Sequence, residues 1–258
     1  MGSALVYRER DHSYFLGGQK VPSVTTATGV LAKPALIWWA AKEAASWAAD
    51  NSEQLATVGR EGFVDEATRA HIRARDTASK IGTQLHLHAE KLASTGEAPD
   101  VAADDLAMVV QAADFLDALS VDPIVSERAV YHETFLYAGR LDLIAAIRGE
   151  VWLLDFKTGA SGVWPEMALQ QAGYRFATHM QGPDPDAPDE PMPPIAHVGI
   201  VWVRPDGWQL VPVRADRDTW QAFLACLPLQ RFLTQKRDQT VGAPVAVGTA
   251  TERLDDDG

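Results

Sequence analysis

The chain has 258 residues, of which 47% are hydrophobic, and its formal net charge is −12. This length is enough for one large domain or two small ones with a sizeable core. The single cysteine, Cys226, excludes an internal disulfide, a four-cysteine zinc site and a cysteine-ligated iron–sulfur cluster. No apolar run is long enough to span a membrane, and residues 1–10 lack the apolar core of a signal peptide. We therefore expect a cytoplasmic protein without a membrane partner.

The first half of the chain predicts a small hairpin followed by helices. The hairpin pairs residues 5–9 with 13–16, and Ser23 is placed to cap a short helix after Pro22. The longer helices are predicted over residues 34–49, 62–77, 79–94 and 102–119. Gly96 stands in the position where a glycine ends a helix.

After residue 120 the pattern changes to strands. The predicted strands cover residues 124–132, 135–147, 151–157, 195–203 and 208–213. Helices are predicted over 164–180 and 217–236, with a Pro/Asp-rich loop over 182–194. This order favours an α/β fold with a helical N-terminal elaboration. We expect one domain over 1–240, with the elaboration in 1–78, a core in 79–237 and a disordered tail over 241–258.

Three charged side chains lie near the ends of two neighbouring predicted strands. Asp155 and Lys157 are two apart and so project to the same side of a strand. Asp142, on the preceding strand of the predicted hairpin, is placed to reach the same point. Burying such charges is costly unless a counter-ion satisfies them. A divalent cation such as Mg²⁺ or Mn²⁺ would do so, although Asp-x-Lys by itself also fits a solvated strand end.

Polar side chains also share one face of the helix predicted over 79–94. Gly82, His86 and Glu90 are spaced four apart, which places them on one stripe. A lone helical histidine is more often a packing residue than a metal ligand, so this stripe gains weight only in combination. On the helix after Lys157, Gln170 and Tyr174 are likewise four apart. They either lie on the surface or hydrogen-bond to a substrate phosphate or a site carboxylate.

Taken together and in this order, the motifs resemble those of the RecB-like branch of the PD-(D/E)XK nuclease superfamily. That branch carries Gly-x-x-x-His, Gly-x-x-Asp, Asp-x-Lys-Thr-Gly and Gln-x-x-x-Tyr. The matching residues are Gly82, His86, Gly139, Asp142, Asp155, Lys157, Thr158, Gly159, Gln170 and Tyr174. Several relatives hold an iron–sulfur cluster with four cysteines. This chain cannot, and so it resembles the cluster-free, phage-type exonucleases, with which it also shares a weaker likeness in residues 12–14 and 21–25.

The resemblance implies a restriction-endonuclease-like fold, a mixed central sheet flanked by helices. It implies that a Mg²⁺ or Mn²⁺ ion is held by His86, Asp142, Asp155 and the backbone carbonyl of Phe156. Asp142, Asp155 and Lys157 would be the catalytic residues, Lys157 positioning water or neutralising developing charge. Glu90 would orient His86, bind a second metal, or simply lie on the helix surface.

Further residues take supporting roles in this interpretation. Gln170, Tyr174, Thr158 and Gly139 would bind substrate or brace the site, with Gly139 allowing close approach. Glu127, on the strand before Asp142, is an additional acidic candidate.

The implied function is a metal-dependent deoxyribonuclease, most simply an exonuclease on linear DNA ends in recombination or repair. The implied partners are DNA and a single-strand annealing protein or recombinase, in the host cytoplasm if the chain is phage-encoded. A restriction-type endonuclease and a non-catalytic DNA-binding subunit are the alternatives. The acidic net charge opposes all three, because phosphate charge dominates nucleic-acid binding. The Trp38/Trp39 pair either stacks on bases or, as the surrounding alanines favour, packs against the next helix.

Overall fold

The computed structural model describes residues 4–95, 103–184, 187–235 and 237–246, and its centre is a seven-stranded sheet. The strand order is β10-β9-β6-β5-β4-β7-β8. Neighbouring strands are antiparallel except β6 and β9, which are parallel, so the sheet is mixed. The strands are β4 (Asp122–His132), β5 (Tyr137–Ile147), β6 (Glu150–Lys157), β7 (His179–Met180), β8 (Glu190–Pro191), β9 (His197–Arg204) and β10 (Gly207–Pro212).

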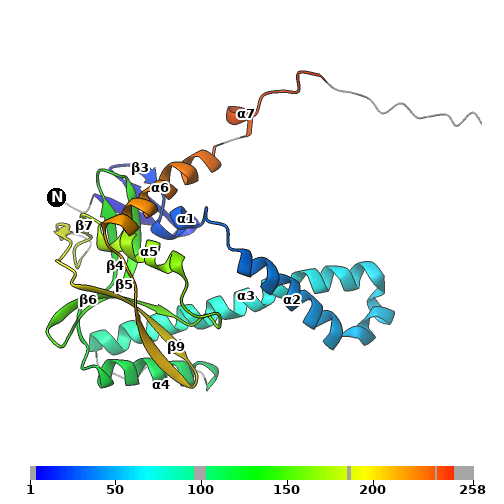
Figure 1. The fold of residues 1–258 in the computed structure, drawn as a ribbon, viewed down its shortest axis with the longest axis horizontal. Helices are drawn as coiled ribbons and strands as arrows, with labels where there is room; N and C mark the ends of the chain where they lie inside the picture. Colours follow the sequence, from blue (N-terminus) through cyan, green and yellow to red (C-terminus); the bar gives the residue numbers. More distant parts are fainter. Residues whose placement is uncertain (1–3, 96–102, 185–186, 236, 247–258) are drawn as a thin grey trace, which may run out of the picture.

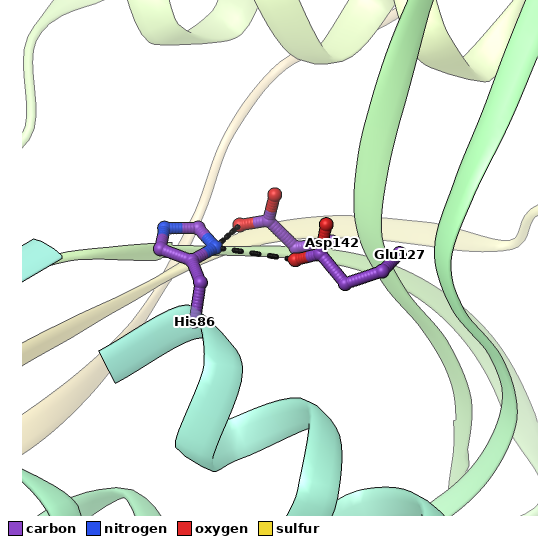
Figure 2. A group of neighbouring side chains, drawn as sticks. All are labelled: His86, Glu127 and Asp142. Atoms are coloured by element: carbon purple, nitrogen blue, oxygen red, sulfur yellow. Dashed lines mark ion pairs between the residues drawn. The ribbon is translucent and has the colours of Figure 1, made fainter. Parts of the chain in front are cut away.

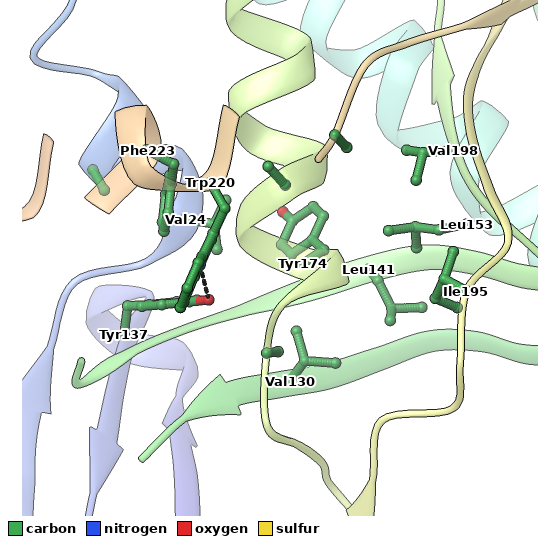
Figure 3. Close-up of a cluster of buried hydrophobic side chains, with 14 of the residues drawn as sticks. Val24, Val130, Tyr137, Leu141, Leu153, Tyr174, Ile195, Val198, Trp220 and Phe223 are labelled. Atoms are coloured by element: carbon green, nitrogen blue, oxygen red, sulfur yellow. Dashed lines mark hydrogen bonds between the residues drawn. The ribbon is translucent and has the colours of Figure 1, made fainter. Parts of the chain in front are cut away.

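Helices cover both faces of this sheet, which confirms the expected α/β class (Figure 1). The helices are α1 (Val24–Thr28), α2 (Pro34–Asp50), α3 (Leu55–Thr95), α4 (Ala103–Ala118), α5 (Pro165–Arg175), α6 (Arg217–Leu233) and α7 (Arg237–Thr240). One core cluster lies under α3 and α4 and includes Phe115, Leu154 and Phe156. The other lies under α1, α5 and α6 and is centred on residues such as Val24 and Tyr137 (Figure 3).

A separate three-stranded sheet at the N-terminus packs against the central one. It contains β1 (Leu5–Arg8), β2 (Ser13–Leu16) and β3 (Gln19–Val21), with the short 3-10 helix η1 (Glu9–Asp11) between the first two. The predicted hairpin is confirmed, and β3 is an addition to it. The turn into β3 uses Gly17 and Gly18, both at positive φ, which glycine adopts at little cost. Ser23 accepts a hydrogen bond from the Thr26 backbone N–H at 2.9 Å, as its predicted capping role requires.

The two helices predicted over 62–77 and 79–94 are one helix, α3. No break occurs near residue 78, because residues 63–81 contain neither glycine nor proline. The single irregularity inside α3 is Gly59, with φ 72° and ψ 171°. After the 3-10 helix η2 (Ser52–Gln54), the first part of α3 packs beside α2. This pair, residues 34–72, extends away from the sheet, and we call it the helical arm (Figure 1).

Other boundaries also differ from the sequence-based prediction, among them the helix predicted over 217–236, which ends at Leu233. The helix predicted over 164–180 ends at Arg175, and residues 179–180 form β7 instead. β5 begins at Tyr137 rather than at residue 135, and the loop predicted over 182–194 contains β8. Gly96 and residues 247–258 lie outside the described part of the chain. Among the described residues, no helix has both the length and the apolarity that crossing a membrane requires.

Candidate metal centre

The candidate site lies where β5 and β6 stop pairing. Their register runs from Ile147↔Glu150 to Leu143↔Leu154 and ends there. One residue further along β5, the contact with β6 is made by a side chain: Asp142 Oδ2 accepts a hydrogen bond from the Phe156 backbone N–H at 2.8 Å. A side-chain acceptor therefore replaces a strand hydrogen bond and holds the Asp142 carboxylate at the opening between the strands.

Glu127 reaches the same opening from β4. Its neighbours pair as Ser126↔Leu143 and Arg128↔Leu141, which places Glu127 beside Asp142. Glu127 has a φ of 46°, a left-handed conformation that is uncommon for a residue other than glycine, asparagine or aspartate. Such strain costs about 1–3 kcal/mol and is found preferentially at functional sites. The strained backbone thus coincides with the carboxylate that faces the site.

His86 enters from α3, on the opposite side of the pocket. The buried Leu85 and Ala89 fix this face of the helix against the core. The His86 Nδ1 lies 3.3 Å from Asp142 Oδ2 and 3.5 Å from Glu127 Oε1 (Figure 2). The imidazole ring meets the Phe156 ring edge-on, with 6.4 Å between centroids. Three different elements therefore direct one nitrogen and two oxygens at a single point.

These spacings fit one divalent cation. Two ligands at about 2.1 Å from an octahedral ion are about 3 Å apart, close to the two distances around His86 Nδ1. The ligand atoms of His86, Glu127 and Asp142 all lie within 4.8 Å of one another. The pocket that they line measures about 10 Å³, roughly the space one water needs, and Glu90 borders it on the next turn of α3.

The electrostatics of the pocket also favour a cation. Burial and the neighbouring Asp155 charge raise the pKa of Asp142 to about 7, because both disfavour the ionised form of the Asp142 carboxyl group. Burial alone would lower the pKa of His86, but the Glu127 hydrogen bond and the Asp142 charge outweigh it and raise that pKa to about 9. In the absence of an ion, a protonated His86 thus supplies the positive charge that the carboxylates require.

Asp155 and Lys157 form an ion pair immediately beside this pocket. Asp155 is 1% exposed, and its Oδ2 contacts the Lys157 ammonium while its Oδ1 accepts a hydrogen bond from Gln170 Nε2 at 3.0 Å. Burial opposes the charged ammonium, but the Asp155 charge prevails and raises the pKa of Lys157. Gln170 also lies 3.5 Å from the Tyr174 hydroxyl, so the predicted Gln/Tyr pair does contact the site.

Two glycines of the motifs, Gly82 and Gly139, lie against other parts of the protein, whereas a Cβ at Gly159 would meet nothing within 4 Å. A Cβ at Gly139 would lie 2.7 Å from Cε1 of the Tyr174 ring and 3.3 Å from Val24 Cγ2. A Cβ at Gly82 would lie 3.6 Å from Thr158 Oγ1, so α3 passes close to the end of β6. The Thr158 carbonyl in turn accepts a hydrogen bond from Arg204 Nη1 at 2.6 Å, which ties the motif loop to β9.

The structure brings the sequence-derived candidates into one neighbourhood but divides them into two groups. His86, Asp142 and Glu127 form the set that could hold an ion, whereas Asp155 is engaged by Lys157 and Gln170. Phe156 contributes its N–H to Asp142, and ligation by its carbonyl stays a prediction. Glu127 received less weight from sequence than its position warrants. The signal that identifies it is the hairpin register, which sets residue 127 opposite residue 142.

Comparison with known proteins gives no family for the chain. No protein-family model matches it, and no curated protein matches it. A similar solved structure, titled "Crystal structure of SSO0001", has 12% sequence identity and a TM-score of 0.36. That alignment covers 83% of this chain and 76% of the other. A likeness this weak carries no conclusion about function.

Proposed function

We propose that the protein is a metal-dependent deoxyribonuclease of the PD-(D/E)XK type, acting on the ends of linear DNA. The observation that carries the proposal is the convergence of His86, Glu127 and Asp142 on one pocket, directly beside the buried Asp155–Lys157 pair. A structural ion pair needs two partners. This site instead gathers five titratable groups from three strands and a helix, one of them on strained backbone. Such a gathering is typical of a catalytic site.

The donor set suits Mn²⁺ or Mg²⁺. Two carboxylates and an imidazole are acceptable to both, and the nitrogen ligand shifts the preference toward Mn²⁺. When bound, such an ion lowers the pKa of its water and stabilises negative charge on a phosphodiester. His86, Glu127 and Asp142 would hold it, with Glu90 near enough to contribute.

The chain's own cations and amides would act on the phosphodiester. Lys157, held by Asp155, presents an ammonium next to the pocket and would neutralise charge that develops on the phosphate. Gln170 fixes the other oxygen of Asp155, so that carboxylate cannot rotate away from Lys157. Arg140 is exposed on β5, two residues before Asp142, and would contact an adjacent phosphate.

The test is a nuclease assay with Mg²⁺ or Mn²⁺ on end-labelled linear duplex DNA and on covalently closed circles. We expect loss of label from the linear substrate alone, and a loss of activity of at least about a hundredfold in Lys157→Ala and Asp142→Asn. Asp117→Asn, at an exposed position on α4, is the matched control and should retain activity. Cleavage of circles would indicate an endonuclease on the same core. Intact linear DNA with either metal would refute the proposal.

A further inference from the structure

The helical arm contains an apolar surface that the rest of the described chain leaves uncovered. α2 is 17 residues long, and none of its residues is buried. Leu36, Ile37 and Trp38 are 53%, 73% and 78% exposed. The sequence-based expectation that the tryptophan pair packs against the next helix therefore holds only for Trp39, whose ring meets His71 of α3 edge-on. Large apolar side chains gathered in this way mark an interaction surface.

The exposed face of α2 has a defined pattern along its length. Ile37 and Trp38 occupy the N-terminal half, and Ala41, Ala45 and Ala49 follow at helical spacing in the C-terminal half, all exposed. The other face, which includes Trp47 against Phe63, packs on α3. The face presented outward is thus bulky at one end and small at the other.

We propose that this face of α2 pairs with the same face of a second copy of this chain, in an antiparallel arrangement. A two-fold axis through the midpoint of α2, near Lys42, sets the bulky half of each helix against the alanine half of the other. Alternating large and small side chains is how facing helices fill the space between them. The same axis brings the two Lys42 side chains of the pair close together, and their long stems let both ammonium groups reach solvent at the edge of the face.

Area and shape are consistent with this occupant. The exposed parts of Ile37, Trp38 and the three alanines amount to roughly 500 Å² per copy, or about 1,000 Å² for two, the smallest area expected of a specific interface. The arm extends beyond the sheet, so two arms can meet without the bodies colliding (Figure 1). The four helices of two arms would then form a bundle. A nucleic acid fits this face less well, because α2 carries a single cation, Lys42.

The test is the mass of the full-length chain by light scattering and sedimentation over about 1–100 µM. We expect the wild type to approach twice 28.0 kDa, and the double variant Ile37→Glu/Trp38→Glu to remain at 28.0 kDa with an unchanged circular dichroism spectrum. Leu233→Glu, at a position 67% exposed on α6, is the matched control and should dimerise like the wild type. No nuclease activity enters the measurement, so it can fail or succeed independently of the proposed function.

A second measurement covers the case in which the double variant unfolds. Lys42→Cys lies at the proposed axis and should form a disulfide-linked dimer on mild oxidation, whereas Leu233→Cys should not. The native Cys226 is buried and should form no disulfide under these conditions. A monomeric wild type throughout the range, or a dimer that survives the double variant, would overturn the inference. So would a monomer whose DNA affinity falls in the double variant, because the face would then bind DNA instead.

Discussion

Replacing Gly139 by alanine tests the close contact that the Gly-x-x-Asp motif makes with α5. The added Cβ would lie 2.7 Å from the Tyr174 ring, about 1 Å inside normal carbon contact. Neither neighbour can yield easily, since Tyr174 is 4% exposed and Val24 is fully buried. Overpacking of this kind costs about 1–3 kcal/mol, against roughly 0.5 kcal/mol gained from the stiffer unfolded chain. We therefore expect a net loss of about 1–2 kcal/mol in the free energy of unfolding.

The assay is urea-induced unfolding, followed by tryptophan fluorescence and repeated in a Tyr174→Ala background. With the ring removed, only the 3.3 Å contact with Val24 Cγ2 remains, so Gly139→Ala should cost much less stability there than in the wild-type background. Gly207→Ala is the control, because a Cβ at Gly207 meets nothing within 4 Å. The reasoning would be refuted by a Gly139→Ala protein as stable as Gly207→Ala, or by an equal loss in both backgrounds.

Three further outcomes are expected. A ligand imidazole must be neutral and a ligand carboxylate ionised, whereas the metal-free pKa values of His86 and Asp142 are about 9 and about 7. Mn²⁺ binding at about pH 7 should therefore release between one and two protons, and it should strengthen as the pH rises toward 9. Calorimetry in two buffers of different ionisation enthalpy measures this, and pH-independent binding would contradict it. Burial lowers the pKa of His132, whose Nδ1 accepts backbone N–H groups; since the unfolded chain binds the proton more readily, stability should be complete above about pH 6.5 and fall below it. Thermal unfolding across this range should show a flatter profile for His132→Gln than for the wild type. Ser23→Ala removes the cap of α1 and should cost about 1 kcal/mol in denaturant unfolding, whereas a Ser23→Asp protein should lose little.

The order of elements could be predicted from sequence because it depends on local patterns, but their ends depend on contacts between distant residues. The sequence between Gly173 and residue 180 contains no glycine or proline, yet the helix α5 ends at Arg175. Phe176 stacks on Trp220 of α6, and the Thr178 backbone N–H donates to the Tyr131 carbonyl on β4. These tertiary contacts outweigh the helical pattern of residues 176–180.

The candidate site was partly predictable for a similar reason. The spacing of His86, Asp142, Asp155 and Lys157 was visible in the sequence, and these residues do lie together. The position of Glu127 follows only from the pairing register of β4 with β5, and its backbone strain has no counterpart in composition or periodicity. Which carboxylate faces the pocket and which one faces Lys157 depends on the separation of β5 from β6.

The continuity of α3 has a mechanical consequence. His86 is 27 residues beyond the bend at Gly59, so the histidine and the far end of the helical arm are joined by one rod about 40 Å long. A flexible linker would let the arm move without disturbing the pocket. A helix instead behaves as a lever, and a load on its long outer end rotates the short end that holds the imidazole against Asp142 and Glu127. Cutting the chain between residues 78 and 79 would leave only about two helical turns of α3 before His86 and would disconnect the arm from the pocket.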